Sequence, residues 1–129
     1  MNHTPHRNPL QRIAAELRRL QNATRFSVQG FQHAWREEAA FRFEVLLAAI
    51  LLPTALLLDV GRLERAALIG SVLLVLIVEL LNSALEAAID RIGTEHHPLS
   101  GRGKDMGSAA VFTALVLAGS TWALLLWPF

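Results

Sequence analysis

The stretch Glu79-Leu80-Leu81-Asn82-Ser83-Ala84-Leu85-Glu86 decides the fold of this 129-residue chain. It follows an uncharged apolar run from Ala66 to Val78, so two carboxylates fall inside what otherwise reads as a membrane-spanning helix. At about 100° per residue, positions 79, 82, 83, 86 and 90 share an arc of about 100° on one helix face. An ionised side chain at the centre of a span costs ~2.5–3.5 kcal/mol on insertion scales, so this polar stripe predicts function. The alternative is a polar seam that only joins helices, although Ser, Thr, Asn or Gln usually serve that purpose.

The composition indicates one small integral membrane domain. Hydrophobic residues make up 53% of the chain and are concentrated in blocks rather than spread periodically. The absence of cysteine excludes disulfides, thiolate nucleophiles and Cys-based metal sites. Seven of the 12 basic residues precede Glu44, which predicts an arm at the membrane surface and no nucleic-acid partner.

The order of these blocks predicts an all-α membrane protein. Residues 1–9 are expected to form a disordered tail, and residues 10–129 a single membrane-embedded domain. An amphipathic helix is expected over about 10–40, with a break near Ser27 and Gly30, and spans are expected over about 40–58, 66–89 and 107–127.

The connections between the predicted spans carry turn-forming and polar residues. Pro53 is expected to kink the first span, and Asp59, Gly61, Arg62 and Glu64 to form a tight turn after it. Residues 91–106 are expected to form a polar loop. Lys and Arg are concentrated in the N-terminal arm and in this loop, and none follows the third span. The positive-inside rule therefore places the N-terminus and the 91–106 loop in the cytoplasm, beside the polar stripe.

The acids and the lysine on this side predict a site for a metal-bound phosphate. Mg²⁺ is commonly held by one or two carboxylates together with nucleotide phosphates, a role open to Glu86 and a second acid such as Glu38. Lys104 would neutralise phosphate charge. Glu79 lies deeper in the span and is the predicted general base. No P-loop is present, because Asp105 stands where that motif has Ser or Thr.

Four motifs carry a resemblance to a known family. They are Glu38-Ala39-Ala40-Phe41-Arg42, Glu79 to Glu86, Asp90-Arg91-Ile92-Gly93, and Leu99-Ser100-Gly101-Arg102-Gly103-Lys104-Asp105-Met106-Gly107-Ser108-Ala109-Ala110. Taken in this order, between roughly Arg19 and Trp127, they resemble the small integral-membrane diacylglycerol kinase of bacteria. That resemblance implies a homotrimer of three-span protomers with an N-terminal surface helix, located in the bacterial inner membrane.

The resemblance also implies an activity and roles for individual residues. The family transfers the γ-phosphoryl group of MgATP to the free hydroxyl of diacylglycerol, which gives phosphatidic acid. Glu79 would be the catalytic base, supported by Asn82, and Glu38 and Glu86 would be the Mg²⁺ ligands. The remaining residues that the resemblance assigns to nucleotide binding are Arg19, Ser27, Glu95, His97, Lys104 and Asp105.

Some positions depart from the family pattern, and two other functions remain open. Phe26 stands where relatives can have Tyr, and Gln29 and Gln32 replace basic residues.

One alternative function is the same catalytic apparatus acting on a polyprenol such as undecaprenol. The other is a non-enzymatic membrane oligomer that uses its intramembrane acids for assembly or proton passage. Three short spans cannot enclose a nucleotide, a metal and a two-chain lipid, so we expect sites at subunit boundaries.

Overall fold

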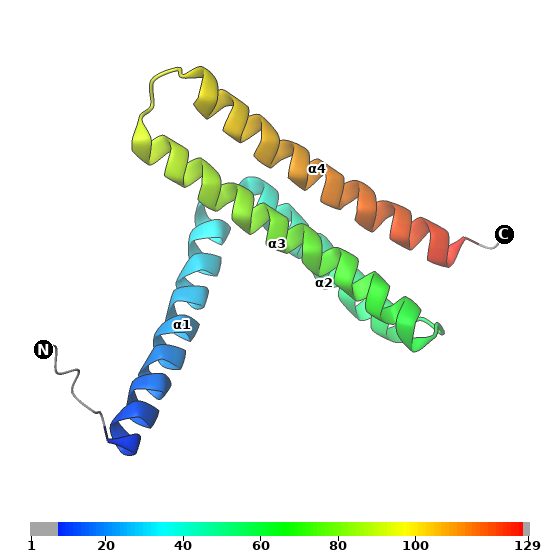
Figure 1. Cartoon of the computed structure of the whole chain (residues 1–129). Helices are drawn as coiled ribbons and strands as arrows, with labels where there is room; N and C mark the ends of the chain where they lie inside the picture. The colour runs from blue at the N-terminus through cyan, green and yellow to red at the C-terminus, as the bar shows by residue number, and fades with distance from the viewer. Residues whose placement is uncertain (1–7, 128–129) are drawn as a thin grey trace, which may run out of the picture.

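A computed structural model of the chain describes residues 8–127, and within that range every regular element is a helix (Figure 1). The four elements are α1 (Pro9–Glu37), α2 (Ala39–Leu57), α3 (Arg62–Ile92) and α4 (Pro98–Leu126). Helices α2, α3 and α4 are long and apolar enough to cross a membrane. The all-α prediction with three candidate spans is therefore confirmed.

Helix α1 runs without interruption and projects away from the other three (Figure 1). The predicted break near Ser27 and Gly30 is wrong. The Ser27 hydroxyl donates to the Ala23 carbonyl oxygen at 3.0 Å, and a single glycine costs a helix only about 1 kcal/mol. Of the predicted tail, residues 1–7 lie outside the described part. Pro9 is helical, because the Asn8 side chain caps the helix and proline suits its first turn.

Helices α1 and α2 meet at an elbow formed by Glu38. The backbone of Glu38 is extended, with φ −106° and ψ 111°, and the residue ends one helix while it starts the next. The Arg42 guanidinium donates to the carbonyl oxygens of Trp35 at 3.0 Å and Arg36 at 3.3 Å. These carbonyls have no partner within α1, so Arg42 closes the end of α1 against the start of α2.

Helices α2 and α3 are joined by a shorter turn than expected. Arg62 and Glu64, predicted in the turn, already belong to α3. The Arg65 guanidinium donates to the carbonyl oxygens of Leu58 at 2.9 Å and Val60 at 3.3 Å, which satisfies the backbone of the short link. Pro53 lies inside α2, which continues past it to Leu57.

Helix α4 begins well before the predicted end of the polar loop. Only residues 93–97 separate it from α3, so the expectation of a loop through Met106 is wrong. Pro98 occupies the first turn, and the ring Nδ1 of His97 accepts from the Leu99 amide at 3.2 Å. A capping side chain followed by proline is a favourable helix start. Gly103, which stood in the predicted loop, and Gly107, at the predicted start of the third span, both allow α4 to approach α3 closely.

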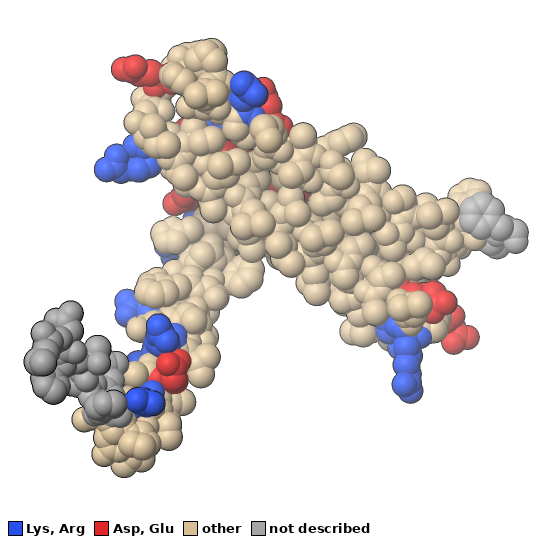
Figure 2. Space-filling model, in the orientation of Figure 1, with Lys and Arg blue, Asp and Glu red and all other residues tan. Residues whose placement is uncertain are grey.

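The packed core lies mainly between α2 and α3. Its buried apolar side chains are Ala34, Phe41, Ala48, Ala55, Leu68, Val72, Val75 and Ala114. Helix α4 contributes only Ala114, although α4 runs alongside α3 (Figure 1). On the face shown in Figure 2, charged side chains gather on α1 and at the two ends of the helical bundle, with an uncharged middle. This distribution suits a belt of lipid around α2, α3 and α4.

Candidate functional site

The polar stripe of α3 contains a buried carboxylate. Glu79 is only 4% exposed, and the Ser83 hydroxyl one turn later donates to the Glu79 carbonyl oxygen at 3.0 Å. Helix α3 has 31 residues and is therefore about 46 Å long, whereas the hydrocarbon core of a bilayer is about 30 Å thick. Part of α3 must extend beyond the hydrocarbon, so a polar stripe in its C-terminal half can reach the interface.

Three other carboxylates, at the elbow, on α2 and on α3, lie close enough to Glu79 for their charges to interact with its own. Glu44 of α2 is 7% exposed, and one of its carboxylate oxygens, Oε2, is buried without a hydrogen-bond partner. The charge of Glu79 interacts with those of Glu38, Glu44 and Glu86. None of the four forms an ion pair within residues 8–127. Concentrated negative charge of this kind suits a divalent cation.

The C-terminal end of the polar stripe has one hydrogen bond within α3 and one ion pair with α4. The Asn82 side-chain Nδ2 donates to Glu86 Oε1 at 3.0 Å, the contact expected for residues four apart on a helix. Lys104 of α4 pairs with Asp90 of α3 through a 2.7 Å contact between Nζ and Oδ1. The charge of Lys104 also interacts with that of Glu86. A cation from α4 therefore lies beside the acids of α3.

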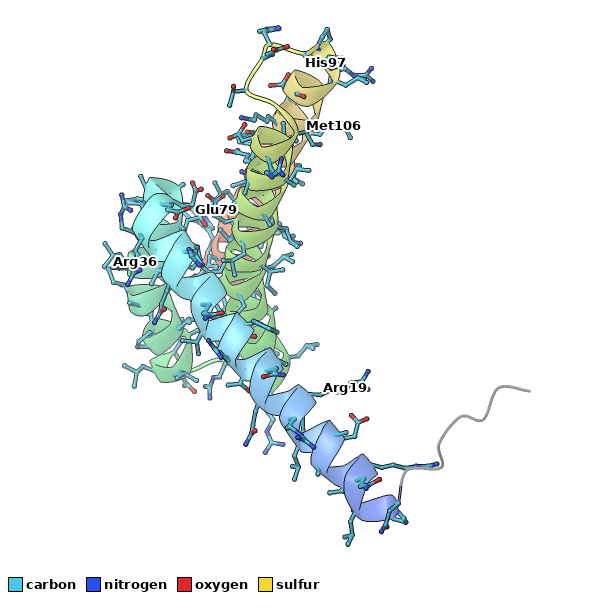
Figure 3. The ribbon with its side chains drawn as sticks, turned by 90° about the vertical axis from the view of Figure 1, so that its left-hand side faces the viewer. Arg19, Arg36, Glu79, His97 and Met106 are labelled. Carbon is cyan, nitrogen blue, oxygen red and sulfur yellow. The ribbon has the colours of Figure 1, made fainter. Side chains whose placement is uncertain are left out.

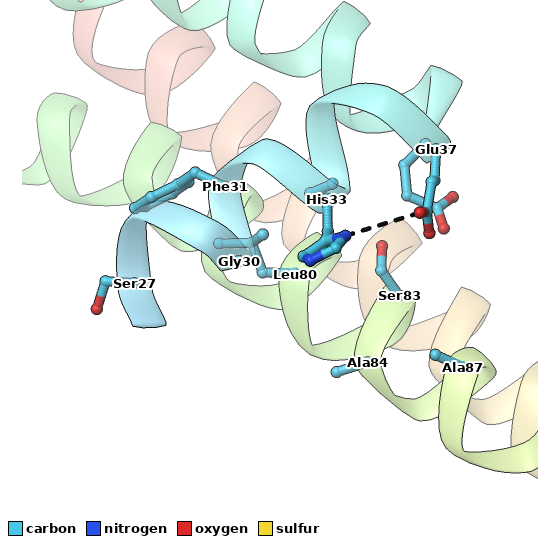
Figure 4. A pocket seen from close by; sticks show the side chains of 11 residues that line it. Ser27, Gly30, Phe31, His33, Glu37, Leu80, Ser83, Ala84 and Ala87 are labelled. Carbon is cyan, nitrogen blue, oxygen red and sulfur yellow. Dashed lines mark ion pairs between the residues drawn. The ribbon is translucent and has the colours of Figure 1, made fainter. Parts of the chain in front are cut away.

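A cavity of about 420 Å³ opens between the second half of α1 and the stripe (Figure 4). Its lining is mostly apolar, with Phe31 and Ala34 of α1 facing Leu80 and Ala84 of α3. Its polar rim includes Ser27, Glu38 and Ser83, as well as His33 and Glu37, whose side chains approach to 3.7 Å. The cavity brings two of the predicted site residues, Ser27 and Glu38, next to the stripe.

Four of the predicted nucleotide residues are not gathered around Glu79 within the chain. Arg19 lies towards the far end of α1, away from Glu79, where it pairs with Glu16 at 3.2 Å (Figure 3). Glu95 is exposed in the α3–α4 link, and His97 caps α4. Asp105 is exposed on α4 next to Lys104. The carboxylate group and the Lys104 pair are thus assembled by one chain, whereas Arg19 stands apart.

The structure gives two results on metal binding. Within residues 8–127, no group of three or more His, Cys, Asp or Glu side chains is arranged to hold a metal ion by itself. A nucleotide-bound Mg²⁺ needs fewer protein ligands, since phosphate and water oxygens complete its shell. Glu38 and Glu86, which both interact with the charge of Glu79, fit that more limited demand.

Several contacts of the site were missed by sequence reasoning. Asp90 pairs with Lys104 across two helices, a contact between residues far apart in the sequence. Arg42, two residues before Glu44, bonds to α1 carbonyls and forms no ion pair with that acid. Ser83 lies on the same helix face as Glu79, so its position near the site could have been inferred from the sequence; in the structure Ser83 lines the cavity. No pattern in the sequence indicated that His33 and Glu37 would line the same cavity.

Comparison with known sequences places this architecture in a family. The sequence model described as Prokaryotic diacylglycerol kinase matches residues 25–126, from the middle of α1 to the end of α4. The chain belongs to the prokaryotic diacylglycerol kinase family. The match includes the whole polar stripe, the elbow at Glu38 and the Lys104 region, and Arg19 lies before it.

Individual members of the prokaryotic diacylglycerol kinase family are similar over most of the chain. A protein of Pseudomonas aeruginosa named diacylglycerol kinase is 58% identical over 110 residues, which cover 85% of this chain and 89% of that protein. Proteins with the same name from Escherichia coli strain K12 and Haemophilus influenzae are each 52% identical, over 84% and 82% of this chain and 89% and 90% of their own length. Together with the three apolar helices, this makes the chain a multi-pass bacterial membrane protein.

Proposed function

We propose that this protein is a membrane lipid kinase that transfers the γ-phosphoryl group of ATP to the hydroxyl of 1,2-diacylglycerol, which gives phosphatidic acid and ADP. Membership of the prokaryotic diacylglycerol kinase family supports the activity. The structural observation that carries the proposal is Glu79, which is 4% exposed, interacts with the charges of three other carboxylates, and lies one helical turn from Ser83 in the lining of a largely apolar cavity. In this proposal the lipid hydroxyl approaches Glu79 from the side of the cavity and meets the complex of Mg²⁺ and ATP there.

Glu79 is the proposed general base. The lipid hydroxyl oxygen attacks the γ-phosphorus, the bond to the β-phosphate oxygen breaks, and the hydroxyl proton passes to the Glu79 carboxylate. Asn82 supports the site through its hydrogen bond to Glu86. Burial of Glu79 keeps water away from the proposed base.

Glu38 and Glu86 are the proposed ligands of a Mg²⁺ ion that arrives with ATP. The charges of both carboxylates interact with that of Glu79, and neither forms an ion pair within the described residues. When bound, the metal would neutralise charge on the phosphates. Lys104, whose ammonium group interacts with the charges of Asp90 and Glu86, would add to that neutralisation.

The other nucleotide contacts are proposed to need a second protomer. Arg19, Glu95, His97 and Asp105 are not gathered around Glu79 in one chain, and α4 buries only Ala114. A homotrimer with sites at the subunit boundaries would cover α4 and bring such residues together. The proposed orientation has the N-terminus and the site on the cytoplasmic side of the inner membrane, with α1 as an amphipathic surface helix, because basic residues are concentrated on that side.

The activity is tested with purified protein in mixed micelles that contain MgATP and either dioleoylglycerol or undecaprenol. We expect phosphorylated lipid to form from dioleoylglycerol. A strong preference for undecaprenol would overturn the proposed lipid substrate but not the kinase activity. If the folded protein phosphorylated neither lipid, the proposed kinase activity would be rejected, and a non-enzymatic membrane oligomer would be favoured.

A further inference from the structure

Asn82 of α3 and Gly107 of α4 lie very close together beside the site. The Asn82 Oδ1 atom occupies the space in which a side chain at position 107 would begin. A β-carbon there would also lie 3.2 Å from Asn82 Cγ and 3.3 Å from Leu85 Cδ2. A side chain of any size at position 107 would therefore require the Asn82 amide to move.

The two ends of the Asn82 amide are in different environments. Its Nδ2 donates to Glu86 Oε1 at 3.0 Å, whereas its Oδ1 is buried and has no hydrogen-bond partner within the described residues. A buried acceptor without a partner is uncommon, because it loses its hydrogen bond to water. The amide is thus held in this orientation by packing against α4, with its NH₂ group directed at Glu86.

We propose that Gly107 is a positioning residue for Glu86. Because glycine has no side chain, α4 leaves room for the Asn82 amide, and the seated amide holds the Glu86 carboxylate. Alanine at position 107 would force the amide to rotate, which takes Nδ2 away from Glu86. This inference rests on the proposed function, since the Glu86 role as a Mg²⁺ ligand belongs to it. Groups that hydrogen-bond to metal ligands typically change metal affinity by about 10- to 100-fold when they are removed.

The first experiment compares Gly107→Ala with Gly119→Ala, a matched control in the same helix whose added β-carbon would meet nothing within 4 Å. Phosphorylation of dioleoylglycerol is measured over a Mg²⁺ titration. We expect Gly107→Ala to raise the Mg²⁺ concentration for half-maximal rate by about 10-fold, and Gly119→Ala to leave it unchanged. An unchanged titration in Gly107→Ala would overturn the inference. An inactive wild-type protein would instead overturn the proposed function.

A second readout needs neither metal nor turnover. The side-chain amide signal of Asn82 in ¹⁵N NMR spectra is assigned by its loss in Asn82→Ala. The inference requires this signal to shift in Gly107→Ala and to stay in place in Gly119→Ala. An unmoved Asn82 signal in Gly107→Ala would show that the amide tolerates the new methyl group, and the positioning role would be rejected.

A double variant separates positioning from a general packing effect. Asn82→Ala removes the atoms with which the new methyl group collides. Mg²⁺-dependent binding of a non-hydrolysable ATP analogue is measured by calorimetry. In protein that already carries Asn82→Ala, adding Gly107→Ala should change this binding little. The full 10-fold effect in both backgrounds would mean that Gly107 acts through another contact. If Gly107→Ala alone does not fold, recovery of folding in the double variant supports the inference, and failure to recover overturns it.

Discussion

Helices α1 and α3 are nearly equal in length, with 29 and 31 residues, yet they use their acidic residues in opposite ways. On α1, Glu16 and Glu37 are exposed and approach nearby basic side chains of the same helix. On α3, Glu79 is buried and its charge interacts with those of acids on other segments. Acids of α1 therefore make exposed contacts within their own helix, whereas Glu79 of α3 is buried beside acids of other segments, where it can take part in chemistry.

Replacing the buried acid gives the largest expected effect. Glu79→Gln keeps the shape of the side chain but removes its ability to accept a proton. We expect the turnover number to fall by about 10²-fold or more, the scale of a lost general base, while MgATP binding stays measurable. Phosphatidic acid formation is the measurement. The control is Glu64→Gln, an exposed acid in the first turn of the same helix, and near-normal turnover in Glu79→Gln would refute the assignment.

Replacing Glu86, at the shallower end of the stripe, should weaken Mg²⁺ binding rather than remove the general base. Glu86→Gln removes a proposed Mg²⁺ ligand, so we expect the Mg²⁺ concentration for half-maximal rate to rise by at least about 10-fold. At saturating Mg²⁺ the rate should recover more than in Glu79→Gln. If Glu86→Gln lowered the rate equally at every Mg²⁺ concentration, its role as a ligand would be wrong.

The elbow that joins α1 to the spans should show a smaller, structural effect. Arg42→Ala removes hydrogen bonds to two carbonyl oxygens at the end of α1. A hydrogen bond from a charged donor contributes about 1.5–3 kcal/mol, and less where solvent reaches it, so we expect a loss of about 1–2 kcal/mol. Thermal unfolding in detergent measures it. Arg36→Ala, which removes an exposed arginine at the same elbow, should change stability less, and equal losses would contradict the proposed contact.

The isolated pair on α1 gives the smallest effect. Both Arg19 and Glu16 are largely exposed, with side-chain exposures of 78% and 65%. Exposed ion pairs contribute about 0–1 kcal/mol, so Glu16→Gln should leave thermal stability almost unchanged. A large loss of stability in Glu16→Gln would mean that α1 is packed against another surface in the folded protein. That result would remove the contrast between α1 and α3.

The parts of the site that lie within one helix were predictable from the sequence. Asn82 and Glu86 are four residues apart, so helical geometry alone puts their side chains together. The place of Glu79 inside an apolar helix also followed from the sequence, because it comes after a long apolar run, whereas its burial by other helices did not. The start of α4 was misjudged, because Gly101 and Gly103 suggested a loop while His97 and Pro98 already carried a helix-start signal. Glycine is ambiguous in sequence, since it serves both turns and close helix contacts.

By itself, the sequence determined the all-helical class, the three apolar helices and the face of α3 that bears the acids. These depend on local periodicity and on the inability of a bilayer to hydrate a backbone. Only the tertiary structure decided that Asp90 pairs with Lys104, that Glu44 lies beside Glu79, and that Gly107 makes room for Asn82. These contacts depend on how far two helices slide and rotate against each other. That register is set by the packing of many side chains at once, which no short stretch of sequence records.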